Sequence, residues 1–177
     1  MPIRVWRLSK SKFARTPLDG EGARLYGGRW NSPGTALVYT SSTLALAQLE
    51  LLVHVDRSDA PTDLVAIELD IPARVGVEIV EIGALPRRWK RYPAPAKLAA
   101  IGTEGATSRR TAVLRVPSAV VPREFNYLLN PEHPDITRIK EVGREKVVFD
   151  VRLFEATKKA TPPTRGAGRV RRPRRKP

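Results

Sequence analysis

The sequence predicts an α+β fold in which a mixed or antiparallel sheet is accompanied by few helices. Two observations lead to this fold class. At least six short, β-prone runs are spread along the chain, and one strong helical pattern lies between them. The connections are irregular, so a doubly wound fold with a helix after every strand is not expected.

The β-prone runs consist largely of aliphatic and β-branched residues, which favour strands. They occupy residues 3–8, 36–40, 64–71, 77–82, 111–116 and 146–154. In the last run, KVVFDVRLF, strict alternation predicts one apolar face of a strand, formed by Val147, Phe149, Val151 and Leu153.

The strongest helical pattern covers residues 43–55 (TLALAQLELLVHV), with Ser41 or Ser42 as the expected N-cap. A second helix is expected in APAKLAAIG, residues 94–102. Two irregular segments stand apart from these elements. Residues 18–34 hold five glycines and a proline, and residues 115–135 hold four prolines and two asparagines. Long irregular segments in a compact domain are commonly functional.

The 177 residues are enough for one domain, expected at residues 1–155, followed by a basic tail at residues 156–177. The tail holds nine of the 32 basic residues and no acidic one, which leaves the domain with 23 basic against 18 acidic residues. We expect the tail to be disordered because it has few large apolar residues to bury. It could add weak affinity for nucleic acid or simply keep the protein soluble.

Composition excludes several kinds of site. The chain has no cysteine and only two histidines, so a thiolate zinc site, a disulfide and a cysteine nucleophile are excluded and no metal site is expected. The N-terminal MPIRVWRLSK lacks the apolar core of a signal peptide, and no apolar run has the length of a membrane helix. A cytoplasmic protein is therefore expected.

Glu50 lies within an otherwise apolar helical pattern, where an ionised carboxylate needs a polar partner. In isolation it could belong to a narrow polar stripe with Gln48 or pair with His54. Arg29, in GGRWN, follows two glycines that permit close backbone approach, and its guanidinium suits a phosphate or a carboxylate. It could equally be a solvated turn residue. Tyr39 could be an ordinary strand tyrosine.

Ser118 and Asn126 lie in the proline-rich segment, where either side chain could simply stabilise a turn. The order of the motifs is more informative than any of them alone. VWRL, EGARLYGGRWNSPGTALVYTS, LAQLELL, RVPSAVVP, FNYLLNP and FDVRL together resemble the RES domain family, the toxins of RES–Xre toxin–antitoxin pairs. The resemblance covers about residues 3–154. One departure lies at residues 102–110, within IGTEGATSRRTAVL.

The resemblance implies an ADP-ribosyltransferase-like fold that binds and degrades NAD+ and is blocked by an Xre-type antitoxin. It implies no metal and no cofactor, since NAD+ is the substrate. Carried over by motif, the catalytic residues are Glu50, Arg29 and Tyr39. The implied NAD+-binding residues are Arg7, Arg29, Tyr39, Ser118 and Asn126.

These residue types suit cleavage of the nicotinamide–ribose bond, which builds positive charge on the ribose. Glu50 would stabilise that charge, and Arg29 would bind the pyrophosphate and offset the burial of Glu50. Tyr39 would stack on nicotinamide or ribose, while Ser118 would bond the ligand or orient the carboxylate. Water, phosphate and a protein side chain remain open as acceptors, self-association of the toxin is also open, and a basic nucleic-acid-binding protein is the alternative of a different class.

Overall fold

A computed structural model describes residues 1–55 and 62–154 of the chain. Seven strands form one sheet in the order β4-β5-β6-β2-β1-β3-β7. β4 and β5 are parallel and the other neighbours are antiparallel. The strands are β1 (Ile3–Lys10), β2 (Val38–Ser41), β3 (Leu64–Ile71), β4 (Val77–Ile79), β5 (Val113–Pro117), β6 (Phe125–Leu129) and β7 (Lys140–Val147). The predicted α+β fold with a mixed sheet is confirmed.

The last predicted strand is wrong in its position. β7 ends at Val147 instead of continuing through residue 154, and the chain turns into a 3-10 helix at Val151–Leu153. Asp150 begins this turn because its carboxylate accepts a hydrogen bond from the Arg152 backbone N–H at 2.9 Å. The predicted common face is therefore broken: Phe149 is buried, whereas Val151 is 70% exposed.

Three α-helices occur in the described residues: α1 (Glu21–Tyr26), α2 (Leu44–Leu52) and α3 (Ala96–Ser108). α2 is the predicted apolar helix, but its N-cap is Thr43, whose hydroxyl accepts from the Leu46 backbone N–H at 3.0 Å. The predicted caps were wrong because Ser41 still belongs to β2. α3 extends the second predicted helix through most of the segment that departs from the family pattern.

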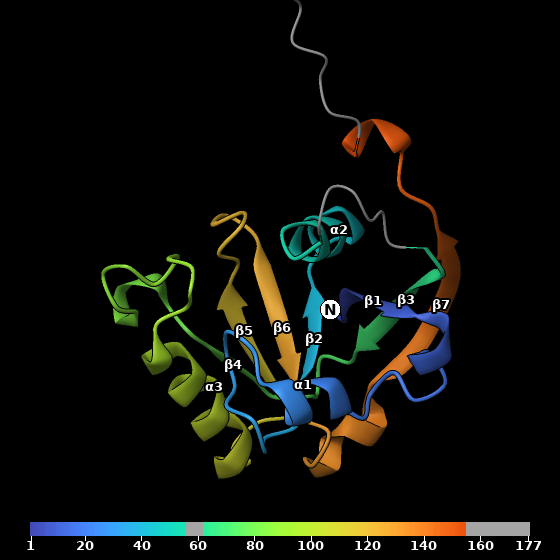
Figure 1. Ribbon diagram of the computed structural model, residues 1–177. Coiled ribbons are helices and arrows are strands. Elements are labelled where there is room, and N and C mark those ends of the chain that lie inside the picture. The colour runs from blue at the N-terminus through green and yellow to red at the C-terminus, as the bar shows by residue number, and fades with distance from the viewer. Residues whose placement is uncertain (56–61, 155–177) are drawn as a thin grey trace, which may run out of the picture.

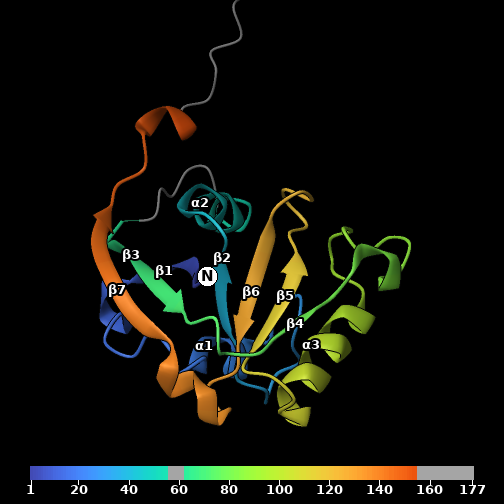
Figure 2. The same ribbon diagram turned by 180° about the vertical axis from the view of Figure 1, so that it is seen from behind.

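The sheet consists of two halves that meet at a narrow joint. β1 and β2 share the single registered pair Trp6↔Ser41, whereas β1 and β3 pair along their whole length. Figures 1 and 2 show β4, β5, β6 and β2 on one side and β1, β3 and β7 on the other, with α2 above the region between them. α3 lies outside the β4–β5 half, over a cluster that includes Trp89, Leu98 and Leu114.

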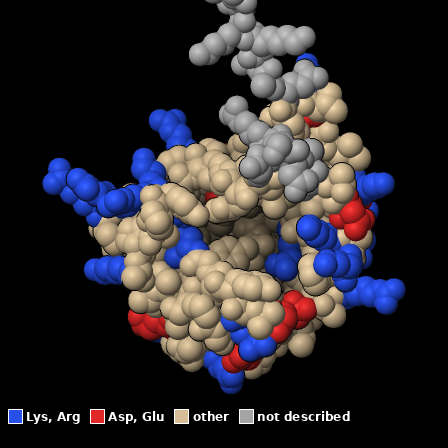
Figure 3. Space-filling model, viewed as in Figure 1, with Lys and Arg blue, Asp and Glu red and all other residues tan. Residues whose placement is uncertain are grey.

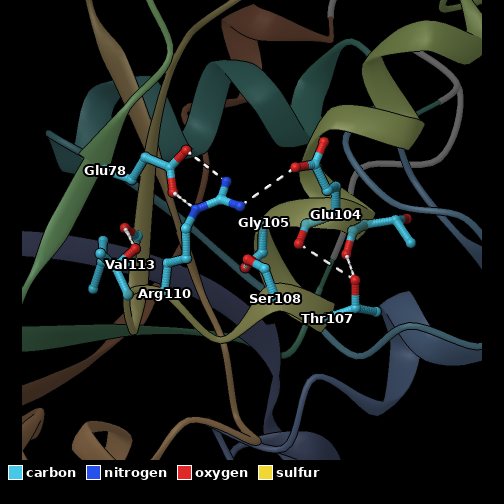
Figure 4. A network of polar contacts seen from close by, with 9 residues as sticks. Glu78, Glu104, Gly105, Thr107, Ser108, Arg110 and Val113 are labelled. Carbon is cyan, nitrogen blue, oxygen red and sulfur yellow. Dashed lines mark hydrogen bonds and ion pairs between the residues drawn. The ribbon is translucent and has the colours of Figure 1, made fainter.

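The outer part of α3 is connected to the sheet by an exposed polar network (Figure 4). Arg110 bridges the Glu78 carboxylate of β4 at 3.0 Å and the Glu104 carboxylate of α3 at 3.3 Å. The predicted basic tail lies outside the described residues. No helix in the described part of the chain has the length and apolar character needed to cross a membrane.

Candidate active site

A cavity of about 840 Å3 opens between the two halves of the sheet. Its walls come from β1, α1 and the turn after it, β2, α2 and β6, and they include Arg7, Arg29, Tyr39, Glu50 and Asn126. Figure 3 shows the hollow in the middle of this face, with Lys and Arg side chains on both sides of it. Five residues that the sequence singled out are thus brought to one cavity of a size typical for small-molecule sites.

Glu50 projects from α2 into this cavity and is held by two neutral donors. Its Oε1 accepts hydrogen bonds from the Ser118 hydroxyl at 2.7 Å and from the Asn126 side-chain amide at 2.6 Å. These contacts replace the partners considered from sequence: in the described residues, Glu50 has no ion pair or hydrogen bond with Arg29, Gln48 or His54. In the described residues two hydrogen bonds, rather than an ion pair with Arg29, satisfy the Glu50 carboxylate.

Ser118 lies behind the carboxylate rather than on the cavity wall. It is fully buried, and its Oγ accepts from the backbone N–H groups of Val120 at 3.1 Å and Val121 at 2.9 Å. The hydroxyl proton is therefore free to be donated to Glu50. Of the two predicted roles for Ser118, this geometry supports orientation of Glu50 over direct contact with a ligand.

Arg29 is positioned by the glycine-rich turn that follows α1. Gly27 adopts φ +70°, which disfavours side chains, and Gly28 packs so closely on the Tyr39 hydroxyl that a Cβ would overlap it. The Arg29 Nη1 donates to the carbonyl oxygens of Trp89 at 2.8 Å and Arg91 at 3.3 Å. One side of the guanidinium thus ties the turn to the loop that carries Tyr92, and the other N–H groups remain for a ligand.

The Tyr39 hydroxyl makes two hydrogen bonds to the same turn. It accepts from the Trp30 backbone N–H at 3.0 Å and donates to Asn31 Oδ1 at 2.7 Å. Burial raises the pKa of this hydroxyl well above its ordinary value of 10.0, so it stays protonated and can serve as a donor. Its ring lines the cavity, whereas its hydroxyl positions the residues next to Arg29.

Sequence reasoning missed two residues that support this turn. Asn31 is buried and donates from Nδ2 to the carbonyl oxygens of Ala23 at 2.8 Å and Thr35 at 2.9 Å. Gly102 of α3 packs against the Trp30 backbone, and an added Cβ would overlap the Trp30 carbonyl oxygen. The "GRWN" motif contained Asn31, but no pattern in the sequence pointed to Gly102.

Arg7 of β1, in the other half of the sheet, lines the same cavity as Arg29 and Glu50. Its Nε is buried and has no hydrogen-bond partner in the described residues. Burial lowers the pKa of the Arg7 guanidinium, and the negative charge of Asp19 partly offsets this effect. As a cavity-lining guanidinium, Arg7 suits an anionic ligand.

The cavity mouth is aromatic. Tyr26 and Tyr92 line it and are 84% and 78% exposed, and the His54 ring lies 6.4 Å from that of Tyr92. Within residues 1–55 and 62–154, no group of three acidic, histidine or cysteine side chains is arranged to hold a metal ion. The site offers a carboxylate, two guanidiniums and stacking surfaces for a polar organic ligand.

A model of the RES domain matches residues 4–152. The chain belongs to the RES domain family. It is 40% identical over 158 residues to the Prs ADP-ribosylating toxin of Sphingobium sp. (strain YBL2), covering 87% of this chain and 98% of that protein. It is 38% identical over 156 residues to a Toxin Res of Photorhabdus laumondii, covering 87% and 99%.

The fold is also similar to a chain of the M. tuberculosis MbcT–MbcA toxin–antitoxin complex. The TM-score is 0.62 with 16% sequence identity, and the similarity covers 87% of each chain. The RES family resemblance inferred from the motifs is confirmed by these comparisons.

Proposed function

We propose that this protein is a toxin that consumes NAD+ by cleaving the bond between nicotinamide and ribose. The observation that carries this proposal is the position of Glu50 in a cavity also lined by Arg7 and Arg29. Two donors bind Glu50 Oε1, while Oε2 has no partner in the described residues. The cavity therefore combines an available anionic oxygen with two cationic groups.

Each of these groups has a use in the proposed reaction. The guanidiniums of Arg7 and Arg29 bind the pyrophosphate, a doubly charged group that suits bidentate contacts. As the C–N bond breaks, nicotinamide leaves with its electron pair as a neutral molecule, and the ribose becomes an oxocarbenium-like cation. Glu50 Oε2 stabilises this cation electrostatically, and the Tyr39 ring packs against nicotinamide or ribose.

The acceptor completes the reaction by adding to the ribose carbon and releasing a proton. With water the product is ADP-ribose, and with inorganic phosphate it is the 1″-phosphate of ADP-ribose. A protein side chain is the second candidate acceptor, because the Sphingobium relative is named as an ADP-ribosylating toxin. All three acceptors require the same cleavage step.

An antitoxin is the proposed protein partner. The similar fold of known structure comes from a toxin–antitoxin complex, which supports inhibition by a second protein. We assign this partner to the Xre type and expect it to cover the cavity in Figure 3 and to supply any DNA binding of the complex. Co-purification of this chain with a co-expressed Xre-type protein, followed by loss of NAD+ turnover, tests this assignment.

The central experiment compares wild-type protein with the Glu50→Gln variant in NAD+ solutions with and without phosphate. We expect nicotinamide release by the wild type and a fall of at least about 100-fold in the variant, because a neutral amide cannot stabilise the ribose cation as a carboxylate does. The product identifies the acceptor as water or phosphate. Labelled NAD+ with a cell extract tests the protein acceptor through labelled protein bands.

Equal turnover by wild type and variant would contradict the role of Glu50. Turnover by neither, with no labelled protein, would contradict the proposed function and favour the nucleic-acid alternative. That alternative makes a separate prediction: deletion of residues 156–177 abolishes function, and binding to nucleic acid falls steeply with salt.

A further inference from the structure

Ser41 occupies a special place in the sheet. It is the last residue of β2, it lies opposite Asn126 of β6, and it forms the single registered pair with Trp6 of β1. Ser41 is therefore located at the joint between the two halves of the sheet. Its side chain is buried, with the residue only 5% exposed.

A chain of hydrogen bonds runs from Ser41 to the candidate catalytic carboxylate. The Ser41 hydroxyl donates to Asn126 Oδ1 at 2.8 Å, and Asn126 Nδ2 donates to Glu50 Oε1 at 2.6 Å. Donors and acceptors are matched along this chain, because the Ser41 hydroxyl donates to the amide oxygen of Asn126 and the amide N–H of Asn126 donates to the Glu50 carboxylate. Such chains strengthen their individual bonds because each donor polarises the next one.

We infer that Ser41 is a positioning residue, which holds the Asn126 amide with its N–H group toward Glu50 and so directs Glu50 Oε2 into the cavity. This inference rests on the proposed function, in which Oε2 is the reacting oxygen. It assigns to Ser41 a role other than the helix cap expected from the sequence.

The cost of removing the Ser41 hydroxyl is expected at the side-chain oxygen of Asn126, which would lose its donor. Asn126 is 8% exposed, and the Ser41 hydroxyl is the donor to its Oδ1 in the described residues. Without this donor, the amide either keeps a buried, unsatisfied oxygen or rotates toward water in the cavity. Rotation breaks the bond to Glu50 and leaves Ser118 as the remaining donor to Oε1.

The backbone around Ser41 does not depend on its hydroxyl. The Ser42 backbone N–H donates to the Phe125 carbonyl oxygen at 3.0 Å, and β2 and β6 pair through four residues. A Ser41→Ala variant should therefore fold. Ser9→Ala is a matched control, since Ser9 is also a buried serine, on β1, and is not a cavity-lining residue. Its hydroxyl donates to the Lys10 carbonyl oxygen at 3.3 Å.

The test combines steady-state kinetics with the NMR signal of the Asn126 side-chain amide, assigned through its loss in Asn126→Asp. In Ser41→Ala we expect kcat for NAD+ to fall roughly 10-fold with KM nearly unchanged. The amide signal should move toward that of a solvated asparagine. Ser41→Thr, which keeps the hydroxyl, should restore both readouts, and Ser9→Ala should change neither.

Other outcomes overturn the inference in distinct ways. A higher KM with unchanged kcat would mean that Ser41 contacts the ligand directly. An unmoved amide signal in Ser41→Ala would show that Asn126 holds its orientation without Ser41. Absence of both NAD+ turnover and labelled protein in the wild type would refute the proposed function, and the amide signal would still decide whether Ser41 orients Asn126.

Discussion

The two sides of α3 contact their surroundings in opposite ways. On the inner side, Gly102 packs against the Trp30 backbone, and the neighbouring Thr103 hydroxyl accepts from the Ser32 backbone N–H at 3.0 Å. On the outer side, Arg110 links Glu104 to β4 through exposed ion pairs (Figure 4). The inner contacts reach the turn that carries Arg29, whereas the outer contacts are solvated.

This difference shows which part of residues 102–110 bears on the cavity. In the sequence, these residues were the visible departure from the motifs that resemble the RES family. It is the C-terminal half of α3 and the turn after it, and it reaches the site through Gly102 and Thr103. The closely packed atoms around Gly102 have no room for a larger side chain. The exposed ion pairs contribute little to stability because water competes for the charges.

The largest effect in this comparison is expected for Gly102→Ala. The added methyl group would overlap the Trp30 carbonyl oxygen, so α3 or the Arg29 turn must shift, at a cost of about 1–3 kcal/mol in the free energy of unfolding. NAD+ turnover should fall as well. Urea unfolding and nicotinamide release measure the two effects.

Gly105→Ala is the control within the same helix. Its methyl group would meet only a flexible part of the Leu114 side chain, at 3.3 Å, and alanine favours the helix by about 1 kcal/mol. We expect unchanged or slightly higher stability and normal turnover. Equal losses in the two variants would argue against a special role for the Gly102 contact.

A stability effect of similar size is expected for Tyr39→Phe, which removes the support of the turn opposite α3. The Trp30 N–H and Asn31 Oδ1 lose their partner, at a cost of about 1–3 kcal/mol if both remain buried. Because burial raises the pKa of Tyr39 in the folded state, its contribution is complete below the ordinary value of 10.0 and is lost as pH rises toward the folded pKa.

The stability difference between wild type and Tyr39→Phe should therefore shrink in alkaline solution. Urea unfolding of both proteins at about pH 8 and about pH 11 measures this change. A difference that grows with pH would contradict the proposed protonation of the buried hydroxyl.

The smallest effect is expected for Arg110→Ala on the outer side of α3. Its ion pairs are exposed, so the Tm should change by less than about 2 °C and NAD+ turnover should stay normal. Thermal unfolding at low and high salt provides the measurement. A loss of stability as large as that of Gly102→Ala would contradict the expectation that the outer contacts of α3 contribute less than the inner ones.

The sequence was a good guide where local chemistry carried the information. Glycines before Arg29 and a carboxylate in an apolar helix were visible as anomalies, and the structure brings Arg29, Tyr39, Glu50 and Asn126 to one cavity. The strand pattern likewise predicted five of the seven strands close to their observed positions.

The missed features depend on contacts between distant parts of the chain. Gly102 meets Trp30, and Ser41 meets Asn126, without any periodic trace in the sequence. β6 was missed because FNYLL lies within a proline-rich segment, and its strand conformation comes from pairing with β2 and β5. The Ser118 contact with Glu50 was among the roles expected from the motifs, whereas the second donor, Asn126, was expected only as a ligand-binding residue.

The distances along the chain between Glu50 and its donors also govern when the site can form during synthesis. Ser118 and Asn126 follow Glu50 by 68 and 76 residues. At a ribosomal rate of about 5–20 residues per second, roughly 4–15 s separate translation of the carboxylate from translation of its second donor. A nascent chain therefore carries Glu50 for seconds without the oriented carboxylate, and truncated chains ending before residue 118 should lack the assembled site altogether.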